Sequence, residues 1–448
     1  MSTANIQSFD VVVIGSGPGG SVLGAQLAQA GLRALMIEKH PFPRYHIGES
    51  LTGVAGDFIR DMQLEGEMER LQFPVKQGVK VMGRSAKSEF FVPVLRPTWQ
   101  VSRAEFDEVL LRRAIGGGAE HRDGTVKEIL REGEKVVGIR YAPRGSDELV
   151  EVRSRFVVDA SGHSVILSKH GVAGPRQIGD FDKQVAVFTQ VKGALRDPGA
   201  MGNNTVIFYS DVYEWSWFIP LSPEVVSVGL VVPSHLFKMN GDSPEALLRW
   251  GFENLNPDLT RRLCDAEWVE PCRVIANYSY RIDPFAGDGW LCIGDAHRFA
   301  DPIFSFGVAS AMVEAAAACK AILKAMETGD WRAPFEEYVA YCNRGQDSIS
   351  DLIKYFWRFP SFFGVQSRGP FRKDIIRLLA GDCFDVGEIP ALTAMRKSLA
   401  LVSLPETEEG GPPRSYRSGR TRWAPQRPAG PEAEETGAPD AQPEPTSS

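Results

Sequence analysis

The sequence lacks several features that would assign it to a simple class. Its six cysteines are scattered without a CxxC pair, so they predict reduced thiols rather than a disulfide framework or a metal site. No run reaches the roughly 18 apolar residues of a membrane-spanning helix. The N-terminal segment MSTANIQSFD has neither the basic nor the apolar region of a signal peptide. We therefore expect a cytoplasmic protein without a membrane partner.

An excess of positive charge is absent as well. The formal net charge is -7, which argues against nucleic-acid binding because phosphate contacts require clustered Lys and Arg. With 43% hydrophobic and 24% charged residues, the chain has the composition of a folded protein. From Pro405 onward, Pro, Gly, Glu and Ser replace almost all apolar residues, so residues 405–448 are predicted to form a disordered tail.

A dinucleotide-binding motif opens the chain. Residues 9–39 read FDVVVIGSGPGGSVLGAQLAQAGLRALMIEK, which predicts a buried parallel strand, a helix with small residues and a second strand. Gly15, Gly17 and Gly20 have the GxGxxG spacing that permits a tight turn, close approach of a pyrophosphate and close helix packing. Glu38 ends the second strand, where its carboxylate can accept hydrogen bonds from ribose hydroxyls. Both NAD and FAD use such a site.

Three later segments narrow the choice of dinucleotide. VSRAEFDEVLLRRA at 101–114 is predicted to be an amphipathic helix. RFVVDASGHS at 155–164 is predicted to be a strand that ends in a turn of small residues. GWLCIGDAHRFADPIFSFGVASAMVEA at 289–315 is predicted to be a strand, a turn and a helix whose first N–H groups can bind an anion or a carbonyl oxygen.

In this order, the four segments resemble the FAD-binding fold of p-hydroxybenzoate-hydroxylase-like flavoproteins. The resemblance implies an α/β fold in which a Rossmann-type FAD-binding domain is interleaved with a β-rich substrate domain and followed by a helical C-terminal region. It also implies that Asp295 lies at the ribityl-pyrophosphate of FAD and that Arg103 lies near the flavin. No second GxGxxG follows a later strand, so no separate NAD(P)H domain is expected. The predicted boundaries are 1–330 for the interleaved module, 75–100 and 180–280 for its substrate-side sheet, 331–404 for the helical region and 405–448 for the tail.

Two more segments resemble a narrower family. PFPRYHIGESL at 41–51 is similar to the FPRxxIGESL stretch of flavin-dependent halogenases, and WSWFIP at 215–220 is similar to their WxWxIP signature. The resemblance implies that FAD, supplied as FADH2 by a separate flavin reductase, reacts with oxygen and converts chloride or bromide to hypohalous acid. It further implies that a wall between flavin and substrate is formed by Trp215, Trp217, Ile219 and Pro220.

The same resemblance implies a lysine that guides hypohalous acid to the substrate. In the family this lysine lies in a KxG-containing strand after the GESL helix. The matching stretch here is FPVKQGVKVMG at 73–83, in which Lys76 stands two residues before Gly78. Lys76 is therefore the predicted catalytic residue, and Lys80 is the alternative.

The halide site departs from the family pattern. Members commonly read FSSG where this chain reads FSFG, so halide is expected to be held through backbone N–H groups of Ser305, Phe306 and Gly307. This replacement leaves the halide preference open. His297 is expected to be structural, and further cofactor contacts implied by the resemblance come from Pro18, Lys39, Arg44, Ile47, Glu49 and Val308.

The substrate and the rival functions remain open at this point. The aromatic-rich region 331–404 is predicted to cover the substrate pocket. Its basic side chains either contact an acidic carrier protein or form a solvated helix face. These basic residues are Arg368, Arg372, Lys373 and Arg377. The expected substrate is an electron-rich phenol or pyrrole of natural-product biosynthesis, free or tethered to an acyl or peptidyl carrier protein. The alternatives are an FAD-dependent aromatic monooxygenase and a flavoprotein that activates neither oxygen nor halide.

Overall fold

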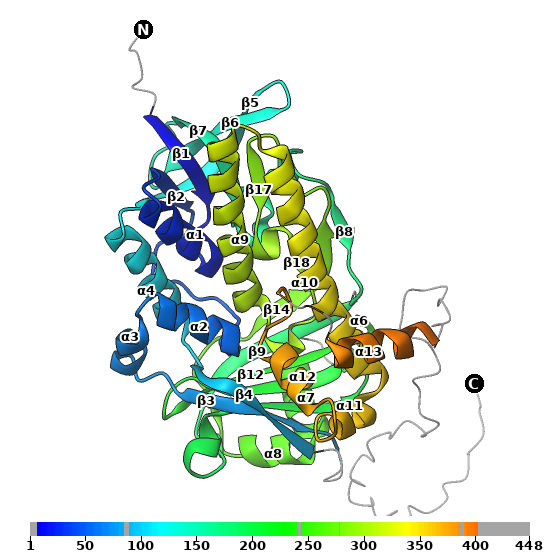
Figure 1. Cartoon of the computed structure of the whole chain (residues 1–448). Helices are drawn as coiled ribbons and strands as arrows, with labels where there is room; N and C mark the ends of the chain where they lie inside the picture. Colours follow the sequence, from blue (N-terminus) through cyan, green and yellow to red (C-terminus); the bar gives the residue numbers. More distant parts are fainter. Residues whose placement is uncertain are drawn as a thin grey trace, which may run out of the picture.

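The computed structural model describes residues 7–84, 89–181, 183–240, 243–276, 278–385, 387 and 389–401, and the predicted tail at 405–448 lies outside them. Two large sheets lie toward opposite ends of the molecule (Figure 1). The long helices α9 (Gly307–Thr328) and α10 (Arg332–Arg358) run lengthwise from the first sheet toward the second.

The first sheet contains the dinucleotide motif. Its parallel strands are ordered β5–β2–β1–β7–β17, and β6 joins β5 and β7 in an antiparallel meander. The second strand is buried along its whole length, as expected for a parallel strand covered on both faces. The strands are β1 (Gln7–Ile14), β2 (Ala34–Glu38), β5 (Glu120–Glu132), β6 (Lys135–Pro143), β7 (Val150–Asp159), β16 (Ala286–Gly287) and β17 (Trp290–Cys292).

Helix α1 (Pro18–Gln29) follows β1 directly and packs against both α4 (Arg103–Gly116) and α9. Its small residues allow this close packing, because a Cβ on Gly19 would lie 3.0 Å from the carbonyl oxygen of Ala311 in α9. Both predicted helices exist; α1 begins at Pro18, and α4 begins and ends two residues after the predicted range 101–114. Such shifts at helix ends are small and do not move the glycine turn.

The second sheet joins two distant parts of the chain. Its order is β13–β9–β12–β11–β10–β3–β4, with β14 also paired to β9, and the parallel pairing of β3 with β10 links the two parts. The strands are β3 (Val75–Met82), β4 (Glu89–Trp99), β9 (Gln184–Lys192), β10 (Thr205–Asp211), β11 (Glu214–Pro220), β12 (Val225–Pro233), β13 (Glu267–Trp268) and β14 (Arg273–Ala276).

The two faces of this sheet belong to different cores. Side chains alternate along β11. Trp215 and Trp217 lie in one core with Phe356 of α10. Phe218 lies in another core with Leu247 of α7 (Pro244–Asn254). The first of these cores also receives the aromatic side chains of the C-terminal helices, which explains why that region is so rich in Phe and Trp. These helices are α10, α11 (Pro360–Gln366), α12 (Arg372–Leu379) and α13 (Pro390–Leu401).

Shorter elements complete the fold. Three short strands form a third sheet, in the order β18–β15–β8. The predicted fold class, an α/β FAD-binding fold with an interleaved β-rich part and a helical C-terminal region, is confirmed. The remaining elements are α2 (Gly53–Asp61), α3 (Glu65–Arg70), α5 (Ile166–Lys169), α6 (Ser234–Asn240), α7 (Pro244–Asn254), α8 (Pro257–Leu263), β8 (Arg176–Ile178), β15 (Tyr280–Ile282) and β18 (Arg298–Phe299).

Candidate active site

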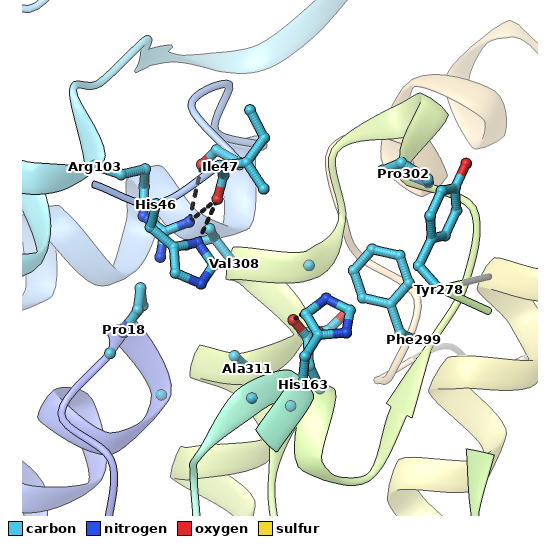
Figure 2. A pocket seen from close by; sticks show the side chains of 18 of the residues that line it. Pro18, His46, Ile47, Arg103, His163, Tyr278, Phe299, Pro302, Val308 and Ala311 are labelled. Carbon is cyan, nitrogen blue, oxygen red and sulfur yellow. Dashed lines mark hydrogen bonds and ion pairs between the residues drawn. The ribbon is translucent and has the colours of Figure 1, made fainter. Parts of the chain in front are cut away.

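A cavity of about 530 Å³ extends from the carboxyl ends of the first sheet's strands to the second sheet. Figure 2 shows Pro18, Arg103 and Ile47 on one side of it and Tyr278 and Pro302 on the other. Besides Trp215, Trp217, Ile219, Ser305, Phe306 and Gly307, the predicted site residues that line it are Gly15, Gly17, Pro18, Glu38, Lys39, Arg44, Ile47, Glu49, Arg103, Asp295 and Val308. The predicted residues that do not line it are Gly20, Lys76 and Pro220.

The turn between β1 and α1 leaves room for a phosphate group. Gly15 has a φ of +102°, and a Cβ there would lie 2.5 Å from the carbonyl oxygen of Ala160. A Cβ on Gly20 would overlap the carbonyl oxygen of Gly15, which explains the third glycine of the motif. A Cβ on Gly17 would instead enter open space, with Arg44 Nη2 as its nearest neighbour at 3.6 Å. A pyrophosphate can therefore approach the first N–H groups of α1 at Gly17.

Glu38 stabilises this turn and keeps acceptor capacity. The carboxylate is buried, and it accepts hydrogen bonds from the backbone N–H groups of Ser16 (2.9 Å) and His40 (3.0 Å). Arg44 Nε lies 3.8 Å from Glu38 Oε1. Because each carboxylate oxygen has a second lone pair, the group can still accept hydrogen bonds from ribose hydroxyls.

Arg103 connects two segments that the sequence singled out separately. Its Nε and Nη2 donate to the carboxylate of Asp107 one turn later in α4, at 2.7 and 3.0 Å. Its Nη1 donates to the carbonyl oxygens of Ile47 (2.6 Å) and Gly48 (3.3 Å), a contact that Figure 2 shows. Arg44 also donates to Asp107, at 3.0 Å. Arg103 therefore both lines the cavity and holds the loop that forms its wall.

Gly294 and Asp295, the GD pair that follows β17, also line the cavity. Gly294 N–H donates to Glu314 Oε2 at 2.7 Å, and Asp295 Oδ2 lies 3.7 Å from His163 Nε2. Burial raises the pKa of Asp295 above its usual value. His297 is buried, stacks on a phenylalanine ring and lies 3.2 Å from Glu314 Oε1 through Nδ1. His297 does not line the cavity, so its contacts are those of a structural histidine.

The two tryptophans of WSWFIP lie on β11 with ring centroids 5.8 Å apart. Trp217 Nε1 donates to Ser227 Oγ of β12 at 3.1 Å, whereas Trp215 Nε1 has no acceptor in the described part of the chain. Gly229 stands opposite Trp217 in the pairing, and a Cβ there would overlap the indole ring. Ile219 lies on the same cavity wall and Pro220 is buried behind it. A rigid aromatic wall therefore lines the end of the cavity at the second sheet.

The FSFG segment forms the start of α9. Ser305 has a φ of +61°, and Phe306 is the N-cap residue, with its buried ring 6.1 Å from that of Phe304. A Cβ on Gly307 would meet no atom within 4 Å, so this helix start is open toward the cavity. The first N–H groups of a helix lack intrahelical acceptors and lie at the positive end of its dipole. They can hold a halide, and the side chain of Phe306 is buried in the core that also contains Trp215.

Lys76 lies on β3 beside a second, small cavity of about 20 Å³. Its side chain is 2% exposed, and its Nζ donates to Ser50 Oγ at 2.8 Å and to the carbonyl oxygen of Leu51 at 2.9 Å. Burial lowers the pKa of Lys76 to about 7. Roughly half of the side chains therefore carry a neutral amine near neutral pH.

Lys80 has a different environment. Its ammonium group lies 3.0 Å from Glu89 Oε1 and 3.7 Å from Asp197 Oδ2. It lines neither of the two cavities. This geometry favours Lys76 over Lys80 as the functional lysine.

An irregularity in β3 directs Lys76 into the cavity. The pairing of β3 with β4 shifts between Lys76 and Gly78, and Lys76 consequently lines the same cavity as Val79 and Val81. The side chain of Asn204 stabilises this irregularity, because its Oδ1 accepts the backbone N–H groups of the two residues after Lys76, at 2.8 and 2.9 Å. Strict alternation along the strand would have placed Lys76 on the face opposite the two valines.

These residues fit FAD. The open space at Gly17 suits a pyrophosphate, Glu38 has lone pairs free for a ribose, and Arg103 and Asp295 lie along the same cavity. In the described ranges there is no group of three His, Cys, Asp or Glu side chains that could hold a metal ion. Of the helices described, none has the length and apolar character needed to cross a bilayer.

Comparison with known proteins identifies the family. A family model described as FAD binding domain matches residues 8–344. The 1H-pyrrole-2-carbonyl-[peptidyl-carrier protein] brominase of Pseudoalteromonas luteoviolacea is 48% identical over 397 residues, which cover 88% of this chain and 97% of the relative. The chain belongs to the flavin-dependent halogenases.

Other halogenases agree with this assignment. The solved structure of flavin-dependent brominase Bmp2 matches with a TM-score of 0.86 and 47% identity, covering 88% of this chain and 99% of Bmp2. A 1H-pyrrole-2-carbonyl-[peptidyl-carrier protein] chlorinase of Pseudomonas fluorescens is 30% identical over 88% of this chain and 94% of its own length. The predicted halogenase function is therefore confirmed, together with FAD and halide as its cofactors, in preference to a monooxygenase or a non-catalytic flavoprotein.

Sequence reasoning missed several residues of this halogenase site. Asp107 could have been found from its i, i+4 spacing to Arg103, and Ser50 belongs to the GESL motif. Asn204 and Thr205 carry no local signal, because their partners lie more than 100 residues away in the sequence. Their positions follow only from the pairing of β3 with β10.

Proposed function

We propose that this halogenase brominates a pyrrole-2-carbonyl group carried by a peptidyl carrier protein. The observation that carries the proposal is the 48% identity, over 97% of its length, to a relative named for that reaction. The chlorinase of the same substrate class is less similar, at 30% identity, so bromide is the halide we expect this enzyme to prefer. At the halide site this chain has Phe306 where family members commonly have a serine, and we connect this difference with the expected preference for bromide.

The site residues divide the work of this reaction. Bound and reduced FAD, together with oxygen, would supply the oxidising power that converts halide to hypohalous acid. The glycine turn at Gly17 binds the pyrophosphate, Glu38 binds the ribose, and the first N–H groups of α9 hold the halide. Trp215 and Trp217 keep the substrate away from the flavin, which prevents direct hydroxylation.

Lys76 then directs the hypohalous acid toward the pyrrole. Its amine is held by Ser50 Oγ and the carbonyl oxygen of Leu51, which leaves at least one N–H of the ammonium form free to donate to the oxidant. Burial of the amine excludes water, so this hydrogen bond is stronger than it would be at the surface.

We assign the carrier protein to the face formed by α12. Leu379 of this helix lines the Lys76 cavity. At its start, Arg372 and Lys373 are exposed and form no ion pair within the described residues. By contrast, Arg368 donates to the carbonyl oxygen of Glu89, and Arg377 donates to Asp382 at 2.7 Å. Two free cations beside the lysine cavity suit an acidic carrier protein. Reduced FAD comes from a separate flavin reductase in the cytoplasm.

The decisive experiment supplies FAD, a flavin reductase, NADH and either bromide or chloride. The substrates are a pyrrole-2-carbonyl carrier protein and free pyrrole-2-carboxylate. We expect intact-protein mass spectrometry to show bromine on the carrier-bound pyrrole and little product from the free acid. Bromination of the free acid alone would overturn the carrier proposal, and hydroxylated product would overturn the role of the tryptophan wall.

A charge-reversed pair tests the docking face. Arg372→Glu with Lys373→Glu should raise the KM for the carrier-bound substrate about fivefold through lost attraction, with kcat nearly unchanged. The matched control reverses Lys127 and Lys135, two exposed lysines on the β5–β6 hairpin at the other end of the molecule (Figure 1). An equal rise in KM for the control pair would refute the assignment of the docking face.

A further inference from the structure

The two cavities meet at a narrow boundary. Trp215 lines only the large cavity, and Lys76 lines only the small one. The residues that line both are Thr205, Ile207, Ile303 and Ser305. Hypohalous acid formed in the large cavity must pass this boundary to reach Lys76. We call these four residues the neck.

Thr205 belongs to a buried chain of hydrogen bonds that ends at Lys76. Gln100 Nε2 donates to Thr205 Oγ1 at 2.8 Å, and Thr205 Oγ1 lies 2.8 Å from Ser50 Oγ. Ser50 Oγ in turn accepts from Lys76 Nζ at 2.8 Å. All four side chains are buried, with exposed fractions of 2% or less. The chain therefore links the neck directly to the functional lysine.

The hydrogens of this chain do not all have acceptors. Ser50 and Thr205 together carry two hydroxyl hydrogens, and only one can lie between their oxygens. In its ammonium form Lys76 donates to this pair, as Gln100 does, so neither accepts a hydrogen from it. With Lys76 in that form, the second hydroxyl hydrogen has no acceptor among the described residues. Thr205 and Ser50 both line the large cavity, so this hydrogen is available to a small polar molecule there.

The position of Thr205 is fixed from both sides. Its neighbour Asn204 accepts the two backbone N–H groups of β3 that follow Lys76, at 2.8 and 2.9 Å. Gln100 Nε2 also contacts the carbonyl oxygen of Asn203 at 3.2 Å. Asn204 therefore stabilises the irregularity in β3 that directs Lys76, and the next residue, Thr205, provides the hydroxyl at the neck.

We propose that the hydroxyl pair of Thr205 and Ser50 binds hypohalous acid at the neck and passes it to Lys76. The free hydroxyl hydrogen donates to the oxygen of the oxidant, which replaces a hydrogen bond to water. Ile207 and Ile303 form the apolar part of the neck, Thr205 and Ser305 are its hydroxyl residues, and Ser50 adjoins it from the large cavity. Thr205 is thus a contact residue for the oxidant, and Ser50 also positions Lys76. This inference rests on the proposed guidance of hypohalous acid by Lys76.

The test compares where the oxidant goes in variants of the complete holoenzyme. Thr205→Val keeps the shape and removes the hydroxyl, Thr205→Ser keeps the hydroxyl, and Thr98→Val is the matched control. Thr98 is a buried threonine of β4, the strand that pairs with β3, and its hydroxyl has no partner among the described residues. Bromination of the carrier-bound pyrrole is measured against bromination of monochlorodimedone, a diketone that traps escaped hypohalous acid. Thr205→Ala serves the same purpose if Thr205→Val does not fold.

Thr205→Val should lower the ratio of pyrrole product to trapped oxidant about tenfold, as expected for one lost hydrogen bond in a buried site. Thr205→Ser should restore most of the ratio, and Thr98→Val should leave it unchanged. An unchanged ratio in Thr205→Val would overturn this inference while leaving the halogenase function intact. If the wild-type enzyme brominates neither the pyrrole nor the diketone, the proposed function itself has failed.

A second measurement on the protein without FAD separates contact from positioning. Competitive acetylation of Lys76 across a pH range, followed by peptide mass spectrometry, gives the midpoint of its titration. Ser50→Ala removes an acceptor of the ammonium form and should lower this midpoint. Thr205→Val should leave the midpoint close to that of the wild type. An equal shift in both variants would show that Thr205 acts only through Lys76, and the direct contact with oxidant would then be wrong.

Discussion

The low pKa of Lys76 has a measurable thermodynamic consequence. Burial lowers the pKa from 10.5 to about 7, and this difference corresponds to about 5 kcal/mol against the charged form. Burial is the one cause of this shift, and Glu49, the neighbour of Ser50, instead accepts a hydrogen bond from Gln190 at 2.9 Å. The folded protein thus holds an amine that the unfolded chain would protonate readily. We predict that this difference appears in the free energy of unfolding of a Lys76→Met variant.

The sign follows from the proton balance. Between about pH 7 and pH 10.5, the unfolded chain binds more protons at position 76 than the folded protein, so the wild type gains stability as the pH rises. Lys76→Met lacks this dependence. Its stability relative to the wild type should therefore fall by about 2 kcal/mol between about pH 7 and pH 9 and stay constant below about pH 6. The hydrogen bonds lost at Ser50 and Leu51 change the offset but not the slope, because neither acceptor titrates.

Urea unfolding of both proteins without FAD, at several pH values, measures this difference. Competitive acetylation of wild-type Lys76 provides an independent check, with an expected midpoint near 7. A stability difference that does not vary with pH, together with an acetylation midpoint above about 9, would refute the argument that burial controls this lysine.

Three other outcomes follow from the site. Lys76→Ala should retain FAD binding and oxygen consumption while brominated product falls by orders of magnitude. Lys76→Arg should also be inactive because guanidinium is larger and stays charged, whereas Lys80→Ala should keep nearly the wild-type activity. Brominated product from Lys76→Ala but not from Lys80→Ala would reverse the assignment of the functional lysine. Glu38→Ala should weaken FAD binding by about 1 to 3 kcal/mol, measured by fluorescence titration, and equal affinity would contradict the ribose contact. NADH alone should not reduce the bound flavin at a useful rate, whereas photochemically reduced FAD should support turnover; rapid bleaching by NADH without a reductase would show that the chain takes hydride itself.

Local sequence was enough to predict the dinucleotide cradle. A buried β-branched strand, a turn that needs glycine at a φ of +102° and a helix with small residues are each determined by neighbours along the chain. The two motifs at 41–51 and 215–220 predicted a halogenase by their resemblance to a known family. This prediction was also possible from local sequence, because the residues of each motif are contiguous. Even the inward face of Trp215 and Trp217 follows from the period of two along a strand.

Tertiary structure decided which lysine enters the cavity and what holds it there. Strand period alone would put Lys76 and Lys80 on one face, but the irregularity after Lys76 separates them. Asn204, the residue before β10, stabilises this irregularity from more than 100 residues away in the sequence. The bond between Ser50 and Thr205 spans 155 residues in the same way. Hydrogen bonds between buried side chains form only where the fold brings the donor and the acceptor within about 3 Å, and no periodicity or spacing in the sequence encodes that distance.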